Sequence, residues 1–267
     1  MKQQAYVAGV GMTHFGKHLD TPLKALATEA MLLALQDAGL ESEALQAAYM
    51  ANAAGGLIVG QEMIPGQVAL RNMGVGGIPV VNIENACASA STAFNQASAM
   101  ITAGFYDVVM VCGFEKLYHE DKRRTFAAFS SAVDVEDPAG MQQRLTASCE
   151  SMGIEAPSGK DGDKRSAFMD IYAVVARHHM QSYGTTQAQF AAVSAKNSFH
   201  GSLNPNAQFR EVLSVEDVLA QREVVYPLTL PMCSPIGDGA AAVILVSKRK
   251  VLELGLRSAV RVVSSVL

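Results

Sequence analysis

Cys87 is the residue whose type and position most clearly suggest chemistry. It lies at the junction of two stretches, in the first turn of the second. Pro79–Glu84 is rich in β-branched residues and predicts a strand, and the alanine-rich stretch Ala86–Gly104 predicts a helix. A thiol in the first turn of a helix lies beside unpaired backbone N–H groups and the positive end of the helix dipole, which favour the thiolate. The backbone N–H of Cys87 could also donate to an oxyanion on an attached acyl group. Cys87 is therefore a candidate nucleophile; the alternative is a structural cysteine that fills a small space in the core.

The other cysteines and a pair of histidines offer no second catalytic group by their spacing. Cys112 lies within an apolar run and is expected to be structural, and we assign no catalytic task to Cys149 or Cys233. The sequence has no CxxC pair, so we predict reduced thiols, no disulfide framework and no bound metal. His178 and His179 are adjacent within a predicted helix and point in different directions, which favours surface or packing roles.

Several separate motifs, in the same order along the chain, resemble the thiolase superfamily, and within it the sterol-carrier-protein-type thiolases. The stretch Asn85–Ser91 resembles the superfamily's nucleophile motif. Tyr183–Thr186 and Asn204–Arg210 look like the signature of its loop domain, and Pro227–Ala242 resembles the segment that returns from the loop domain to the sheet. The resemblance covers essentially the whole chain and favours the nucleophilic role of Cys87 over the structural one.

The resemblance implies acyl-transfer chemistry. In this family an acyl group passes from coenzyme A to the cysteine, and the acyl-enzyme then condenses with an acetyl-type carbanion. In the degradative direction, coenzyme A cleaves a 3-ketoacyl-CoA. A thioester intermediate suits this chemistry because it preserves the reactivity of the starting thioester. We therefore predict a thiolase-type acyl-CoA acyltransferase of lipid metabolism with Cys87 as acyl acceptor, acyl-CoA or coenzyme A as substrate, and no permanently bound cofactor.

Basic residues and one histidine are the candidate substrate-binding groups that the resemblance implies. Arg123, Arg124, Lys164 and Arg165 could receive the phosphates of coenzyme A, because the family's loop domain covers that molecule. A solvated charged surface is the alternative interpretation of these four residues. His200 is a further candidate because it lies in a stretch that matches the loop domain.

Strand-like and helix-like stretches alternate along the chain, which indicates an α/β fold. The resemblance makes this fold thiolase-like, with a layered mixed β-sheet, a buried central helix after Cys87 and an inserted loop domain. We expect the N-terminal half of the fold in residues 1–117 and 235–258, the loop domain in 118–234, and the start of a truncated second half in 259–267. The last segment is expected to be a lone strand with no sheet to join.

Two motifs of the family's second half, Gly-His-Pro and His-Asp-Cys-Phe, do not occur in this sequence. They carry the activating histidine and the second acid–base group of the family. The chain alone is therefore expected to be an incomplete catalyst that needs C-terminal residues or a separate subunit to supply the base. Two alternatives stay open: a non-catalytic subunit that binds acyl-CoA or lipid or has a structural role, and a retro-aldolase that acts on CoA thioesters.

Composition argues against several other classes of protein. The chain has 21 Lys and Arg against 25 Asp and Glu, and this net charge of −4 gives no reason to expect nucleic acid as a partner. Its longest apolar runs, such as Ala240–Val246, are far shorter than the roughly 20 residues of a membrane span, and no signal-peptide pattern is present, so we expect a cytoplasmic protein. Only 17% of the 267 residues are charged, against about 25% in typical soluble domains, which suggests a homodimer or higher oligomer.

Overall fold

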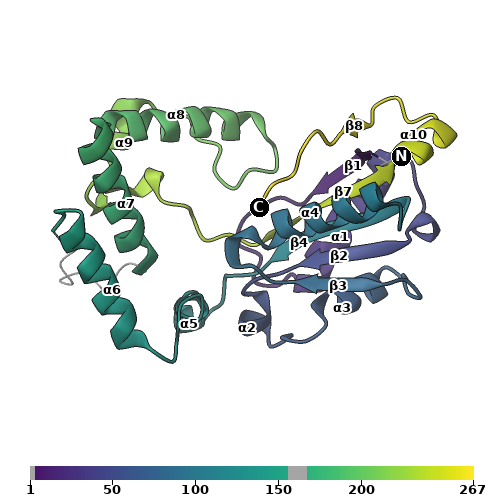
Figure 1. Cartoon of the computed structure of the whole chain (residues 1–267), viewed down its shortest axis with the longest axis horizontal. Helices are drawn as coiled ribbons and strands as arrows, with labels where there is room; N and C mark the ends of the chain where they lie inside the picture. The colour runs from purple at the N-terminus through teal and green to yellow at the C-terminus, as the bar shows by residue number, and fades with distance from the viewer. Residues whose placement is uncertain (1–3, 156–166) are drawn as a thin grey trace. The chain divides into compact units, whose positions relative to one another are not determined.

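Figure 1 shows a computed structural model of the chain, which describes residues 4–155 and 167–267. The chain forms two compact units. The first comprises Met1–Thr125 and Gly237–Leu267, and the second comprises Phe126–Ile236. The second unit is therefore an insertion in the sequence of the first.

The first unit is built on a six-stranded mixed sheet with the strand order β3-β2-β4-β7-β1-β8. β2, β3 and β4 are mutually parallel, whereas β7 runs antiparallel to both β4 and β1. The central strand β4 is apolar and buried over most of its length, as expected of a strand covered on both faces. The mixed α/β sheet that the sequence predicts is confirmed. The strand bounds are β1 (Ala5–Met12), β2 (Ala47–Ala51), β3 (Val80–Ile83), β4 (Val108–Glu115), β7 (Gly239–Ser247) and β8 (Val260–Arg261).

Helices cover both faces of this sheet (Figure 1). α1 (Leu23–Ala38) and α3 (Pro65–Asn72) pack on one face, and α4 (Ser89–Ala103) packs on the other. α1 approaches β1 very closely, because a Cβ atom on Gly11 would lie 2.1 Å from the carbonyl oxygen of Ala30. α4 buries the side that faces the sheet and leaves Ser91 and Gln96 exposed.

Shorter elements complete the first unit. They are a 3-10 turn at Ser42–Ala44, α2 (Gly55–Val59), a 3-10 turn at Ala86–Ala88 and α10 (Lys248–Leu254). α5 (Lys122–Ser130) spans the boundary between the two units along the chain. None of the helices within 4–155 and 167–267 is long and apolar enough to cross a membrane.

The described part of the second unit is mainly helical. α8 begins with a capping box in which Thr186 and Gln189 satisfy each other's backbone N–H groups, as expected of an N-cap threonine. The elements of this unit are α6 (Pro138–Ser151), α7 (Ala167–Tyr183), α8 (Gln187–Leu203), α9 (Val215–Ala220), β5 (Glu223–Val225), β6 (Leu228–Thr229) and a 3-10 turn at Leu230–Met232.

The last segment of the chain differs from the sequence-based expectation. β8 pairs antiparallel with Tyr6 and Val7 of β1, so it joins the sheet of the first unit. Beyond it, Asn95 Nδ2 of α4 donates a hydrogen bond of 2.8 Å to the carbonyl of Ser265. The expectation of a strand with no sheet to join is therefore wrong, because β1 offers a free edge for pairing.

Candidate active site

Cys87 lies in the tight connection between β3 and α4. β3 ends at Ile83, Ala86–Ala88 form the 3-10 turn, and α4 begins at Ser89. The Cys87 side chain is exposed. The Cys87 thiol therefore fills no space in the core of the first unit as the structure describes it.

The backbone of this connection is unusual at Ala86, which has a φ of 45° in the left-handed region. Its N–H donates a hydrogen bond of 2.6 Å to Glu84 Oε1. Its carbonyl accepts a hydrogen bond of 2.7 Å from Ser89 Oγ. The turn that carries Cys87 is thus held by side chains on both sides. Sequence reasoning missed this feature, because alanine carries no signal for a left-handed conformation.

The same end of the sheet holds further polar groups. β2, β3 and β4 are parallel, so their carboxyl ends lie together and bring Asn52, Glu84 and Glu115 to one end of the sheet. Glu115 Oε2 accepts the backbone N–H groups of Ala53 and Ala54 at 3.1 and 3.0 Å, and its Oε1 accepts Asn52 Nδ2 at 3.1 Å. This carboxylate fixes the loop that follows β2.

A hollow of about 280 Å³ opens at these strand ends. Ligands of open α/β sheets bind outside the carboxyl ends of the strands. Glu84 lines the hollow, and its carboxylate also accepts the N–H of Ala86 in the turn that carries Cys87. One residue therefore belongs both to the hollow and to the segment around the thiol. The lining residues share a position at or after the ends of β2 and β3 or in the α2–α3 segment: Met50, Asn52, Ala53, Gly56, Leu57, Glu62, Ile64, Pro65, Asn82, Ile83 and Glu84.

A completely buried carboxylate, Asp238, holds together segments that are far apart in the sequence. Its Oδ1 accepts the backbone N–H groups of Leu117 and Tyr118 at 2.7 and 2.9 Å, and its Oδ2 accepts that of His18 at 3.0 Å. Three backbone donors compensate the burial of the charge. Asp238 therefore joins the start of β7 to the segments that follow β1 and β4.

Lys116 is a second buried charged residue of the first unit, with 6% of its surface exposed. Its Nζ donates to the carbonyl of His18 and, at 2.6 Å, to the carbonyl of Thr21. Sequence reasoning missed both Lys116 and Asp238. The available signal was a charged residue placed directly beside an apolar strand sequence, where burial requires polar partners.

The basic candidates are only partly placed. Arg123 Nη2 pairs with Asp121 Oδ2 at 2.8 Å, and this guanidinium lowers the pKa of Asp121 to about 2. The Arg124 side chain is directed to the carbonyl of Ile58, with an Nη1–O distance of 3.4 Å. Lys164 and Arg165 lie outside the described residues. Of the four basic candidates, Arg123 and Arg124 therefore lie within the described residues, and each of them already has a hydrogen-bond partner in the protein.

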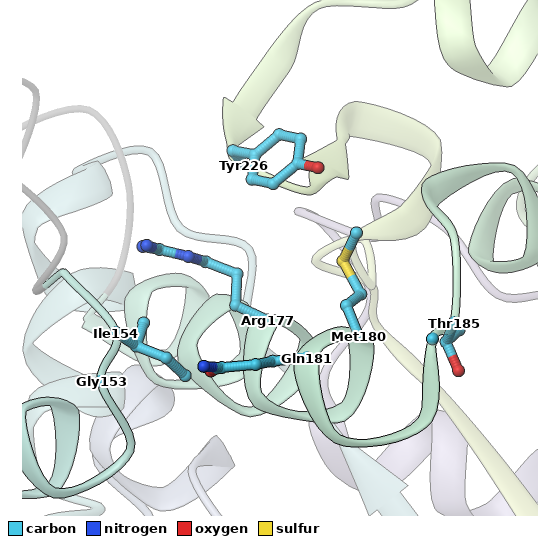
Figure 2. A pocket seen from close by; sticks show the side chains of 8 residues that line it. Gly153, Ile154, Arg177, Met180, Gln181, Thr185 and Tyr226 are labelled. Carbon is cyan, nitrogen blue, oxygen red and sulfur yellow. The ribbon is translucent and has the colours of Figure 1, made fainter.

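His200 lies on α8 in the second unit, where it is exposed and its ring centroid is 5.7 Å from that of Phe199. A separate hollow of about 390 Å³ occurs in this unit, and His200 does not line it. Figure 2 shows Arg177 and Met180 projecting from α7 toward the side on which Tyr226 lies. Arg177 Nη1 donates a hydrogen bond of 2.8 Å to the carbonyl of Glu155. Neither Arg177 nor Tyr226 was a sequence-based candidate.

The other cysteines differ from Cys87 in environment. Cys112 and Cys149 are buried, and burial raises the pKa of the Cys112 thiol far above its ordinary value, as befits the predicted structural role. Burial also raises the pKa of the half-buried Cys233, although Arg222 acts in the opposite direction. Outside positions 1–3 and 156–166, no group of three or more His, Cys, Asp or Glu side chains is arranged to hold a metal.

Comparison with solved structures defines the class of fold first. The structure called "Ltp2-ChsH2(DUF35) aldolase" matches with a TM-score of 0.67, covers 96% of this chain and 57% of its own chain, and is 24% identical in sequence. This likeness shows a shared fold.

The sequence comparisons then give the family. The family described as "Thiolase, N-terminal domain" matches residues 5–226, so the chain belongs to the thiolase N-terminal domain family. Together with the structural match, this makes the fold thiolase-like, as the resemblance predicts. An acetyl-CoA acetyltransferase of Methanothermobacter thermautotrophicus is 38% identical, over 90% of this chain and 56% of the relative. The benzoylsuccinyl-CoA thiolase subunit BbsB of Thauera aromatica is 31% identical, over 100% and 61%. Sterol carrier protein 2 of Homo sapiens is 32% identical, over 96% and 44%. The chain thus spans about half the length of the curated relatives it matches.

Proposed function

We propose that this chain is the acyl-accepting part of a thiolase-type acyl-CoA acyltransferase, with Cys87 as the nucleophile. The observation that carries the proposal is the exposed thiol in the turn between β3 and α4, within a stretch that resembles the thiolase nucleophile motif. Membership of the thiolase family supports it, as do relatives named for acetyl-CoA acetyltransferase and thiolase activities.

The proposed step is a thioester exchange. The Cys87 thiolate attacks the carbonyl carbon of the acyl-CoA thioester, a new carbon–sulfur bond forms, and the bond to the sulfur of coenzyme A breaks. The proton that the Cys87 thiol gives up to the base is returned to the released coenzyme A thiolate. The backbone N–H of Cys87 and the N-terminal end of α4 are the proposed source of stabilisation for the negative charge that develops on the carbonyl oxygen. The acyl-enzyme remains a thioester, so it can transfer its acyl group onward.

The base and the second acid–base group are proposed to come from residues outside this sequence. The absence of the Gly-His-Pro and His-Asp-Cys-Phe motifs motivates this part of the proposal. They would be supplied by a continuing C-terminal segment or by a separate subunit. The relative named as a thiolase subunit, BbsB, is compatible with either arrangement.

We propose that the segment 118–234 acts as the loop domain and covers acyl-CoA, with Arg124, Lys164, Arg165 and His200 among its contacts. Arg123 is the weakest of the basic candidates, because Asp121 already binds its guanidinium through two carboxylate oxygens. The remaining parts of the proposal are a role in lipid metabolism, a cytoplasmic location and a homodimer or higher oligomer. The low charged fraction of 17% supports the oligomer.

The test is acyl transfer to the purified chain. After incubation with acetyl-CoA, peptide mass spectrometry should find acetyl thioester on Cys87. Cys87→Ser should form no thioester, and the matched variant Cys233→Ser, in the other unit, should be acylated like the wild type. Absence of an adduct on Cys87, even after the C-terminal half of a relative is added, would refute the proposal and leave a non-catalytic acyl-CoA-binding or structural subunit.

The retro-aldolase alternative is separated by its products. A thiolase converts a 3-ketoacyl-CoA and coenzyme A into two acyl-CoA molecules. A retro-aldolase releases a ketone or an aldehyde from a hydroxylated CoA thioester. Chromatography of the products formed by the chain together with the C-terminal half of a relative distinguishes the two reactions.

A further inference from the structure

We infer that Ser89 is the positioning residue of Cys87: its hydroxyl holds the left-handed turn at Ala86 that carries the thiol to the surface. The inference rests on the proposed function of Cys87. Ser89 would act only through the backbone on which Cys87 is mounted and would not touch the substrate.

The left-handed conformation of Ala86 requires a stabilising contact. Ala86 and Ile64 are the two non-glycine residues with positive φ in the part of the chain that the structure describes. An isolated alanine adopts the left-handed region about tenfold less often than the right-handed one, so such a residue persists only where its surroundings fix it. Ala86 lies directly before Cys87, and any relaxation of its φ would redirect the thiol.

The Ser89 hydroxyl bridges the two sides of this turn. Its Oγ accepts the N–H of Asn85 at 2.8 Å and donates to the carbonyl of Ala86 at 2.7 Å. Only 5% of the Ser89 surface is exposed, so water has little access to replace the hydroxyl. The Ala86 N–H also donates to the Glu84 carboxylate, but this acceptor is exposed and is therefore a weaker restraint.

Ser89 is itself attached to a firmly packed element. It is the first residue of α4, and the first turn of this helix lies close to β4 at Gly113. A Cβ atom on Gly113 would lie only 2.8 Å from the Cβ of Ala90. Asn85 Nδ2 also donates to Thr92 Oγ1, one turn further along α4, at 2.9 Å. The sheet therefore fixes the helix, the helix fixes the hydroxyl, and the hydroxyl fixes the turn.

The chain offers a matched control in Ser91. Its hydroxyl donates to the carbonyl of Ala88 at 2.9 Å, within the first turn of the helix, and its side chain is exposed. Ser91→Ala therefore removes a hydroxyl from the same turn of the same helix, while the restraints on Ala86 remain.

Single-turnover acylation by acetyl-CoA, measured over a range of acetyl-CoA concentrations, tests the inference. Because a misplacement of about 1 Å can cost roughly 100-fold in rate, Ser89→Ala should lower the maximal acylation rate of Cys87 by at least about tenfold. The half-saturating acetyl-CoA concentration should stay within about twofold. Ser91→Ala should behave like the wild type. A wild-type rate in Ser89→Ala would overturn the inference.

A double variant separates positioning from general stability. Glycine adopts positive φ without steric cost, so Ala86→Gly introduced into Ser89→Ala should restore most of the lost rate. If Ser89 merely stabilised the fold, glycine would restore nothing, and that result also refutes the inference. Ala86→Val, at an exposed position, provides a second perturbation that spares the core. Valine does not tolerate positive φ, so it should reproduce the slow acylation of Ser89→Ala.

Alkylation distinguishes failure of this inference from failure of the proposed function. If wild-type Cys87 takes no acyl group, the proposed function fails, but the rate of Cys87 alkylation by iodoacetamide still reports its presentation. Ser89→Ala should change that rate at Cys87 and leave Cys233, in the other unit, unchanged. Equal alkylation of Cys87 in the wild type and in Ser89→Ala would overturn the positioning role.

Discussion

Replacement of Asp238 by asparagine tests whether the buried carboxylate secures the first unit. Asparagine has nearly the same shape, so the variant changes charge and hydrogen bonding and leaves packing intact. One side-chain oxygen can still accept the N–H groups of Leu117 and Tyr118. The amide nitrogen then faces the N–H of His18, which loses the partner that it has at 3.0 Å in the wild type.

The magnitude follows from these three bonds. Loss of one hydrogen bond to a charged acceptor costs about 1.5 to 3 kcal/mol. The other two bonds change from a charged to a neutral acceptor and lose roughly half their strength, and the release of a buried charge offsets part of that loss. We therefore expect the free energy of unfolding to fall by about 3 kcal/mol, which corresponds to about 6 to 12 °C in Tm for a unit of this size.

Thermal unfolding followed by circular dichroism measures the change, and hydrogen–deuterium exchange assigns it. Exchange should accelerate in the peptides that contain His18 and Leu117. Asp20→Asn, the same substitution at an exposed position of the first unit, serves as the control and should leave Tm unchanged. If Asp238→Asn unfolds within about 2 °C of the wild type, the three hydrogen bonds do not stabilise the unit as reasoned.

Two further predictions concern the sheet. Gly11→Ala should destabilise the first unit by about 3 kcal/mol, because the added Cβ would lie 2.1 Å from the backbone oxygen of Ala30. The urea midpoint should fall. An unchanged midpoint would contradict the close approach of α1 to β1. Burial acts to raise the pKa of Asp107, but hydrogen bonds from Ser247 and Arg249 outweigh burial and lower the pKa below its ordinary value. That stabilisation is present above about pH 4 and is lost as the pH falls further, so Asp107→Asn should lower the urea midpoint at pH 7 and weaken its acid dependence.

The elements with strong local patterns could be predicted from sequence. β4 is a continuous apolar run, and such a run is typical of a strand buried on both faces. The helix after Cys87 was predicted over Ala86–Gly104, and the structure has a 3-10 turn at Ala86–Ala88 followed by α4 up to Ala103. The end of this helix was predictable because glycine is favoured at the position where a helix stops. Gly104 indeed follows the last residue of α4 and adopts the left-handed conformation.

The features that were missed depend on contacts between distant segments. Asp238 accepts backbone N–H groups of residues 18, 117 and 118. The sequence around Asp238 indicates a glycine-flanked turn and a charge beside an apolar strand, but it does not indicate these partners. The pairing of β8 with Tyr6 and Val7 likewise joins the two ends of the chain. The bridging role of Ser89 depends on the left-handed conformation of Ala86, which cannot be recognised from the residue type. Local propensity cannot supply these relations, because each depends on where another segment lies.

The antiparallel pairing of β4 with β7 has a consequence for how the insertion is tolerated. Glu115 of β4 lies opposite Gly239 of β7, so the chain leaves the sheet and re-enters it at points about 5 Å apart. The segment between these two residues is therefore one very long connection between two adjacent antiparallel strands. The entropy of closing such a connection grows only with the logarithm of its length. Insertions and deletions between the two residues can therefore change the size and content of the second unit, while the ladder between β4 and β7 keeps its register.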